Sequence, residues 1–315
     1  MKIVVLDAET FGTDLDLSPL SGVGETTVYP ITPADLVAER ISDAEVVIIN
    51  KVKLNETNLA AASSLKLICI MATGYDNVDT AYCRSAGIAV CNVVGYSTHN
   101  VAQLTVAMVM SLINRLPEYT EFVRSGAYTA SGIPNKLEPV YHEICGKKWG
   151  IIGYGNIGKQ VGRVAEAMGC ELLVYKRTPE PGAPCVDLET LCRESDVISV
   201  HTPLNDGTRG LIDAAHIAMM KKDVIFINVA RGAVTDEAAL AAALKEGKIG
   251  ALGVDVYSVE PFSADHPFNE IKALPNVCLT PHMAWGSYEA RVRCLSEVIK
   301  NIGAYYAGER RCRVD

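Results

Sequence analysis

Short apolar runs alternate along this chain with longer stretches whose spacing is typical of helices. The runs are continuous rather than polar at every second position, which is typical of strands buried on both faces of a parallel sheet. A first set comprises Ile3–Asp7, Val46–Asn50, Leu67–Met71 and Ala89–Asn92. A second set comprises Lys148–Ile152, Glu171–Tyr175, Val197–His201, Val224–Asn228, Gly250–Val256 and Val277–Leu279. Two such sets, each interspersed with helices, predict two parallel α/β sheets.

Two helix candidates indicate how the two predicted domains are connected. The longest helix candidate runs from about Asn100 to Leu116, between the two sets of strands, and is apolar nearly all round. Such a helix is expected to be buried between domains or in an oligomer contact. A second candidate, Tyr288 to Tyr306, follows the last strand and is expected to cross back to the first domain. The predicted domains are residues 1–98 with 285–315 and residues 99–284, with a ligand cleft between them.

Three glycines spaced G-x-G-x-x-G stand between a strand and a helix of the second domain. An apolar run leads into Gly153, Gly155 and Gly158, and a helical run from Lys159 to Met168 follows. The first glycine is expected to make a tight turn, the second to let a pyrophosphate approach, and the third to let the helix pack closely. The helix N-terminus would then face the phosphates. An ordinary glycine-rich turn is the alternative, but the order of strand, glycines and helix favours a dinucleotide-binding domain. The first domain is then the substrate domain.

Composition and charge argue against several classes of function and location. The chain has 315 residues and a formal net charge of −8, which gives no electrostatic case for binding nucleic acid or an anionic membrane. Its ten cysteines are scattered without a C-x-x-C pair, which argues against a zinc site and fits buried thiols in a reducing cytosol. The N-terminal apolar run meets Asp7 too early for a signal peptide, and no run approaches the length of a membrane span. A cytoplasmic protein without a metal site is expected.

Polar residues follow three strands of the second set, at the sheet edge where parallel α/β domains bind ligands. Arg231 could grip a carboxylate there, although a surface arginine capping a strand is the alternative. His282 follows Pro281 and can carry a proton near neutral pH, although a lone loop histidine is more often structural. Glu260 precedes Pro261 and is otherwise a solvated side chain. If the three converge, Glu260 would orient the His282 ring and favour its protonated form.

The order of motifs resembles that of the D-isomer-specific 2-hydroxy-acid dehydrogenases, most closely their glycerate dehydrogenase and hydroxypyruvate reductase branch. The resemblance covers the whole chain and rests on motifs that are weak singly and specific together. They are Ala72–Asp79, Gly95–Thr98 with Val101–Gln103, Gly153–Gly158, Val229–Gly232, Asp255–Pro261 and Pro281–Trp285. The family implies two doubly wound parallel-sheet domains, one a Rossmann-type cofactor domain and the other a flavodoxin-like substrate domain.

The resemblance implies roles for these residues. Arg231 would bind the substrate carboxylate and carbonyl, His282 would be the acid/base, and Glu260 its carboxylate partner. The backbone N–H groups of Thr73 and Gly74 would bind the substrate carboxylate from the other domain, unless these residues only end a strand. Asn156 and Ile157 would lie over the pyrophosphate, Asp255 near the nicotinamide carboxamide, and His201 on the adenosine side, with a role in packing as the alternative for His201. The full implied cofactor set is Gly153, Gly155, Asn156, Ile157, Gly158, Lys176, Arg177, Thr178, His201, Thr202, Pro203, Val229, Ala230 and Asp255.

The chain departs from the usual pattern after the strand Glu171–Tyr175. An acidic residue about 20 residues beyond the first glycine usually accepts the adenine ribose hydroxyls. Here the strand ends in Lys176, Arg177 and Thr178. Two cations and a hydroxyl could bind a 2′-phosphate, which favours NADP over NAD as the cofactor. The alternative is that both cations point into water and that Thr178 or solvent meets the ribose.

The predicted function is the NAD(P)-dependent reduction of a small 2-keto acid such as hydroxypyruvate or glyoxylate. Trp285 and Tyr96 are expected to line the substrate pocket, with interdomain packing as the alternative for Trp285. A nucleotide-sensing protein like the transcriptional corepressors that share this fold is the alternative function, and formate oxidation a third. The set of Arg231, Glu260 and His282 favours an enzyme, since a sensor need not keep all three. A homodimer is expected by analogy.

Overall fold

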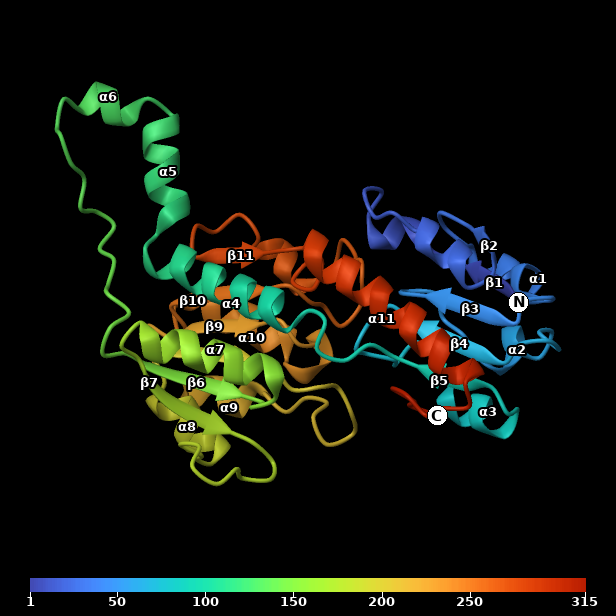
Figure 1. Ribbon diagram of the computed structural model, residues 1–315. Helices are drawn as coiled ribbons and strands as arrows, with labels where there is room; N and C mark the ends of the chain where they lie inside the picture. Colours follow the sequence, from blue (N-terminus) through green and yellow to red (C-terminus); the bar gives the residue numbers. More distant parts are fainter. The chain divides into compact units, whose positions relative to one another are not determined.

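The computed structural model describes residues 1–315, which form two compact units. Unit 1 comprises Met1–Ser97 and Trp285–Asp315, and unit 2 comprises Thr98–Ala284. Each unit is built on one sheet in which every strand pairs in parallel with its neighbours (Figure 1). The predicted fold class of two parallel-sheet α/β domains is therefore confirmed.

Unit 1 contains a five-stranded sheet with the order β2-β1-β3-β4-β5, which is that of flavodoxin-like domains. Its strands are β1 (Lys2–Val5), β2 (Glu25–Val28), β3 (Val46–Ile49), β4 (Leu67–Ile70) and β5 (Ala89–Cys91). One face packs on α1 (Val37–Ile41), α2 (Glu56–Leu59) and α3 (Thr80–Ser85), and the other on α11 (Tyr288–Tyr306). The apolar pattern does not predict β2, because this edge strand is polar and has no buried side chain.

Unit 2 contains a six-stranded sheet with the order β11-β10-β9-β8-β6-β7. Its strands are β6 (Lys148–Ile152), β7 (Glu171–Tyr175), β8 (Val197–Val200), β9 (Ile225–Asn228), β10 (Ala251–Val254) and β11 (Val277–Leu279). On one face α4 (Thr98–Ile113) packs beside α7 (Asn156–Ala167). The other face is covered by α8 (Leu188–Glu194), α9 (Ala214–Met219) and α10 (Glu237–Lys245), whose apolar side chains share one core with the strands (Figure 1).

The helices differ from the prediction in three respects. The stretch predicted as one helix up to Leu116 ends at Ile113, because Arg115 adopts a left-handed conformation with φ 54°. The longest helix is α11, with 19 residues against 16 in α4. The α7 helix starts at Asn156 rather than Lys159, so its first turn includes part of the glycine motif. Within its unit, α4 packs on α7, β9 and β10, so its apolar side chains cover the sheet.

Between α4 and β6 the chain extends away from the sheet of unit 2 (Figure 1). This segment, residues 116–143, is called the arm, and it contains α5 (Leu116–Arg124) and α6 (Ala127–Ser131). No side chain of α5 or α6 is buried. None of the helices of the protein combines the length and apolarity that crossing a membrane requires.

Candidate active site

The strand order of unit 2 reverses at β6, which pairs with β7 on one side and β8 on the other. Ligands of open parallel sheets bind at such a switch point, beyond the carboxyl ends of the strands. Gly153 follows β6 with φ +96°, and a Cβ on it would lie 2.7 Å from the backbone nitrogen of Thr202, which follows β8. Glycine is therefore required where these two loops touch.

The other two glycines of the motif have different surroundings. A Cβ on Gly158 would lie 2.3 Å from the Gly153 carbonyl oxygen, so glycine lets α7 begin against the loop. Gly155 has open space where a Cβ would be, so a phosphate can approach its backbone. Asn156 and Ile157 form the first turn of α7, where backbone N–H groups lack partners within the helix. The loop therefore fits the pyrophosphate of a dinucleotide.

His201 lies just beyond β8 and is held by a neighbouring hydroxyl. Its Nε2 is 3.0 Å from Ser199 Oγ, which also accepts the Trp149 indole N–H at 2.9 Å. Its Nδ1 is buried and has no hydrogen-bond partner. Burial lowers the pKa of His201 to about 3, so the ring is neutral at physiological pH. These contacts describe a packing histidine, and a role in binding adenosine stays a proposal for His201, Thr202 and Pro203.

Glu180 lies between one cation that follows β7 and one cation of α7. Glu180 is paired with Lys159 Nζ at 2.6 Å and with Lys176 Nζ at 2.7 Å, and these hydrogen bonds lower its pKa to about 2. Arg177 and Thr178 are exposed, and the Arg177 guanidinium lies close to Gly207 in the loop after β8. Sequence reasoning missed Lys159 and Glu180, because nothing in their spacing indicates that α7 brings a lysine beside this loop.

Arg231 follows β9 in a loop that is shaped by one buried amide. The Asn228 side chain donates to the Arg231 carbonyl at 3.0 Å and accepts the Ala230 N–H at 3.0 Å. The Arg231 guanidinium in turn donates to the Ala230 carbonyl at 2.8 Å. Val229 and Ala230 connect the strand to the arginine, and a role for them in binding the cofactor stays a proposal. Asn228 is a positioning residue that sequence analysis used only as a strand end.

His282 and Glu260 are in direct contact, although 22 residues separate them. His282 Nδ1 lies 2.6 Å from Glu260 Oε2, and Glu260 Oε1 accepts the Tyr257 N–H at 2.9 Å. Since Nδ1 faces the carboxylate, Nε2 is the nitrogen that can exchange a proton with a substrate. Arg231, Glu260 and His282 follow β9, β10 and β11, which are adjacent strands. The structure thus gathers the three residues at one edge of the unit 2 sheet.

The turn that carries His282 is held by Asp255. His282 has a left-handed backbone with φ 53°. The buried Asp255 carboxylate accepts the Thr280 hydroxyl at 2.6 Å and the N–H groups of Met283 and Ala284 at 2.8 and 2.9 Å. Burial raises the pKa of Asp255, and these hydrogen bonds oppose the increase. Asp255 therefore positions the turn on both sides of His282, and a contact with the nicotinamide carboxamide stays a proposal.

In unit 1 the predicted substrate residues follow β4 and β5. Thr73 Oγ1 donates to the Val93 carbonyl at 2.8 Å, and the Thr73 carbonyl accepts the Asn92 side-chain N–H at 2.7 Å. These bonds fix the turn that includes Gly74. The rings of Tyr96 and Trp285 meet edge-on at 6.5 Å, and both pack on the core of unit 1. This contact describes packing within unit 1, so a role for the two rings in a substrate pocket stays a proposal.

The fold and the glycine loop are those of a dinucleotide-binding oxidoreductase, and comparisons with known proteins identify its family. Residues 106–284 match the family described as D-isomer specific 2-hydroxyacid dehydrogenase, NAD binding domain. The chain is 37% identical over 310 residues to a glycerate dehydrogenase of Methylorubrum extorquens, covering 98% of this chain and 97% of the relative. It is 34% identical over 317 residues to a hydroxypyruvate reductase of Blautia hydrogenotrophica, covering 98% of each. An acyclic imino acid reductase solved in complex with NADPH and D-Arg has a TM-score of 0.89 and 29% identity over the full length of both chains.

The chain therefore belongs to the D-isomer specific 2-hydroxyacid dehydrogenase family, as its motifs predict. It is an oxidoreductase that acts on the CH–OH group of 2-hydroxy acids and uses a nicotinamide cofactor. These comparisons do not favour the alternative of a corepressor-like sensor.

Proposed function

We propose that the protein works as a 2-keto-acid reductase on a small substrate of the hydroxypyruvate or glyoxylate kind. The observation that carries this proposal is the 2.6 Å contact between His282 and Glu260, which follow β11 and β10, while Arg231 follows β9, the next strand of the sheet. The names of the two relatives, glycerate dehydrogenase and hydroxypyruvate reductase, support the same substrate class.

Each of the three residues has a distinct part in the reaction. A bound nicotinamide cofactor supplies the hydride. Arg231 binds the substrate carboxylate through parallel N–H groups and polarises the neighbouring carbonyl. His282 holds at Nε2 the proton that passes to the carbonyl oxygen, while Glu260 keeps the ring oriented through Nδ1 and balances its charge. Thr73 and Gly74 are proposed to offer backbone N–H groups to the same carboxylate.

A turnover assay tests this function. Hydroxypyruvate, glyoxylate and pyruvate are each supplied with NADH and with NADPH, and kcat/KM is measured for every pair. Hydroxypyruvate or glyoxylate should give the highest value. The proposal would be overturned if none of the three acids is turned over although fluorescence shows that the protein binds a reduced cofactor. That result would favour the alternative of a nucleotide-sensing protein.

For the cofactor, NADPH is the proposed preference. No acid stands directly after β7, and the exposed Arg177 and Thr178 are available to a 2′-phosphate. Glu180 does not replace the missing acid, because both of its oxygens are engaged by lysines. It does neutralise part of the local positive charge, so the preference should be moderate rather than absolute.

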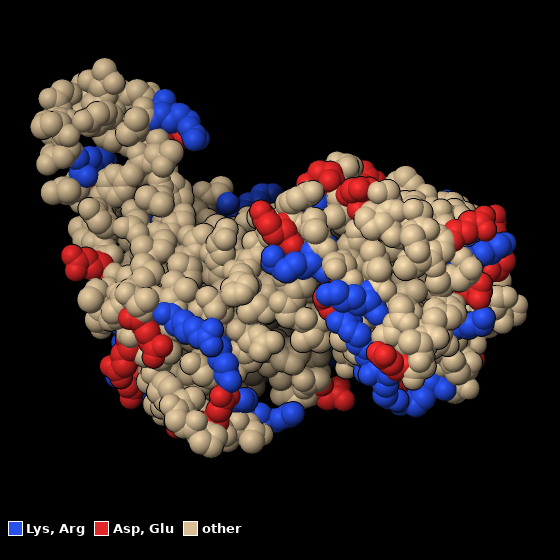
Figure 2. All heavy atoms as spheres, viewed as in Figure 1, with Lys and Arg blue, Asp and Glu red and all other residues tan.

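A homodimer that uses the arm is the proposed assembly. Seven large apolar side chains between residues 116 and 141 are at least 38% exposed, namely Leu116, Val123, Tyr128, Ile133, Leu137, Val140 and Tyr141. Figure 2 shows much of the visible face of the arm without charged side chains. An exposed apolar surface of this extent is typical of a protein contact.

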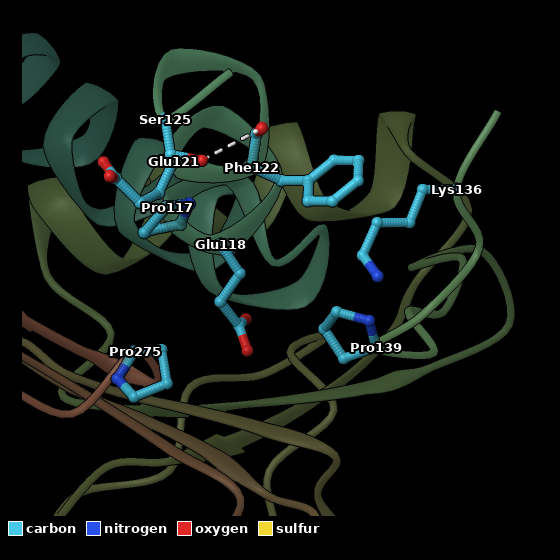
Figure 3. Close-up of a pocket in the computed structure, with 8 residues that line it drawn as sticks. All are labelled: Pro117, Glu118, Glu121, Phe122, Ser125, Lys136, Pro139 and Pro275. Carbon is cyan, nitrogen blue, oxygen red and sulfur yellow. Dashed lines mark hydrogen bonds between the residues drawn. The ribbon is translucent and has the colours of Figure 1, made fainter. Parts of the chain in front are cut away.

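The arm also borders a concave surface that a second copy could fill. A cavity of about 420 Å³ lies between the arm and Pro275, which precedes β11 (Figure 3). From the arm it is lined by Pro117, Glu118, Glu121, Phe122, Ser125, Lys136 and Pro139. Because identical subunits most often pair about a two-fold axis, a partner of the same chain is the simplest occupant. A cytoplasmic location is also proposed, since the scattered cysteines fit a reducing compartment.

A further inference from the structure

Glu237, the first residue of α10, is a buried carboxylate that has no part in the chemistry above. Its side chain is 10% exposed and lies against the loop that follows β10. Its Oε1 accepts the Ser258 N–H at 2.9 Å. Its Oε2 accepts the Ser258 hydroxyl and lies 3.2 Å from His266 Nε2. A buried carboxylate is costly unless it is hydrogen-bonded, so these partners hold each other in place.

His266 can take only one orientation and tautomer in this arrangement. Its Nδ1 accepts the Phe268 N–H at 3.2 Å and so caps the short helix Pro267–Glu270. In the neutral ring the proton is then on Nε2, which donates to Glu237. The ring is enclosed by those of Phe262 and Phe268, whose centroids lie 4.8 and 4.9 Å away, and its side chain is 8% exposed.

The Tyr257–Ser258 peptide connects this pair to the active site. The N–H groups of Tyr257 and Ser258 donate to different glutamates, the first to Glu260 and the second to Glu237. The same peptide packs on Gly232, where a Cβ would lie 2.1 Å from Tyr257 C and from Ser258 N. Gly232 directly follows Arg231. Glu237 therefore anchors a peptide that adjoins both the arginine loop and the loop of Glu260.

We propose that Glu237 and His266 are positioning residues that keep Glu260 against His282 Nδ1. This inference rests on the function proposed above. In unit 2 the charged and titratable groups near His282 are Glu260 and Asp255, with Tyr257 close to both carboxylates, and Arg231 follows β9, two strands from β11. If the loop is released, Glu260 withdraws from the imidazole. For keto-acid reduction, the fold decrease in kcat should then exceed the fold increase in KM. The alkaline limb of the kcat profile should lie at a lower pH than in the parent protein.

A matched pair of His266 variants separates this role from a merely structural one. His266→Asn keeps an acceptor for the Phe268 N–H and removes the donor to Glu237, whereas His266→Gln keeps a donor toward Glu237 and removes the cap. His266→Asn and Glu237→Gln should each lower kcat by roughly 10- to 100-fold, up to the loss that a displacement of about 1 Å can cause. Both should move the alkaline limb of the kcat profile to lower pH, and His266→Gln should leave that limb in place. Melting temperature and the Kd for NADPH, measured for each variant, show that the fold and cofactor site persist.

Glu260→Gln serves as the reference and separates this proposal from the proposed function. If Glu260→Gln moves the alkaline limb while Glu237→Gln and His266→Asn do not, the positioning role is overturned and the proposed function stands. If His266→Gln shifts the limb as far as His266→Asn, the donor to Glu237 is not what matters, because loss of the imidazole ring is the change that both variants share, and the positioning role is again overturned. If Glu260→Gln changes neither kcat nor the pH profile, the acid/base assignment fails and this proposal fails with it. Should Glu237→Gln not fold, the His266 pair decides alone.

Discussion

Single residues of the active site are placed by buried polar side chains that bind the backbone of their neighbours. Asn228 fixes the loop of Arg231, and Asp255 fixes the turn of His282 through two backbone N–H groups. Neither residue carries the proposed chemistry. Each determines where a charged or titratable group points, and small displacements of such groups are costly for catalysis.

Arg231→Lys keeps the positive charge and should still fail. A lysine cannot offer two parallel N–H groups to a carboxylate, so KM should rise and kcat fall. The expected loss in kcat/KM is roughly 10- to 100-fold, since a hydrogen bond to a charged group is worth about 1.5–3 kcal/mol. Steady-state kinetics with hydroxypyruvate measure it, and the Kd for the cofactor should stay unchanged. Kinetics equal to those of the parent would show that another group, such as the turn at Thr73 and Gly74, binds the carboxylate.

At the scale of elements, the carboxyl ends of β7 and β8 carry the residues that are proposed to bind the adenosine part of the cofactor. The end of β8 holds a neutral histidine, and beside the end of β7 Glu180 pairs with Lys176 and with Lys159 of α7. The histidine after β8 leads to a prediction about stability in acid, and the cations after β7 lead to one about cofactor specificity.

His201 should make the protein less stable in mild acid. Its pKa is about 3 in the folded protein and near 6.5 in the unfolded chain, so between these values the unfolded chain binds one more proton. The free energy of unfolding therefore falls as pH decreases through this window, by about 2 kcal/mol from this group between pH 7 and pH 5. Unfolding midpoints at the two pH values should show a smaller loss for His201→Gln than for the parent. The exposed His99→Gln is the control, and equal losses in all three proteins would refute the assignment.

The cations after β7 should determine the choice of cofactor. The double variant Lys176→Asp with Arg177→Ala places an acid at the strand end, which should accept ribose hydroxyls and repel a 2′-phosphate. The ratio of kcat/KM for NADPH to that for NADH should fall below the parent value. As a matched control, Glu180→Gln releases the lysines and should raise the ratio. A parent enzyme that clearly prefers NADH would contradict the proposed preference and leave the cations as surface charge.

On the scale of the whole molecule, the arm predicts association. Light scattering of the parent should give about twice the 33.9 kDa of one chain. Val123→Asp with Leu137→Asp puts charge on two side chains that are 60% and 65% exposed, so it should dissociate the dimer without unfolding unit 2. The exposed Val259→Asp, outside the arm, is the control for surface charge. A monomeric parent would contradict the prediction.

The sequence predicts the buried parts of the fold better than the exposed ones. The limits of β6, β7, β11 and α11 agree with the predicted ranges, because apolar runs and polar boundaries coincide there. The strand β2 has no such signal, since its polar side chains lie at an exposed edge. A single left-handed residue, Arg115, ends α4 earlier than its apolar pattern suggests.

The residues proposed for catalysis can be found from motifs, but their supporting contacts cannot. Arg231, Glu260 and His282 each follow an apolar strand, so topology brings them to one sheet edge. The pairs Lys159–Glu180 and Glu237–His266 lie 21 and 29 residues apart without a local pattern, and only the packing of α7 and α10 on their neighbours brings them together. Cofactor specificity and the positioning of Glu260 are both proposed to depend on such long-range pairs, which a sequence pattern does not reveal.

The most direct test of the account is the turnover of His282→Ala. The parent and the variant are compared in hydroxypyruvate and glyoxylate reduction with saturating reduced cofactor, and the Kd for the cofactor is measured on the same preparations. Loss of the general acid should lower kcat by roughly 10²- to 10⁴-fold, while cofactor binding changes little because the glycine loop lies after a different strand. A variant that keeps kcat within a few-fold of the parent would show that His282 does not deliver the proton, and the central claim would then be wrong.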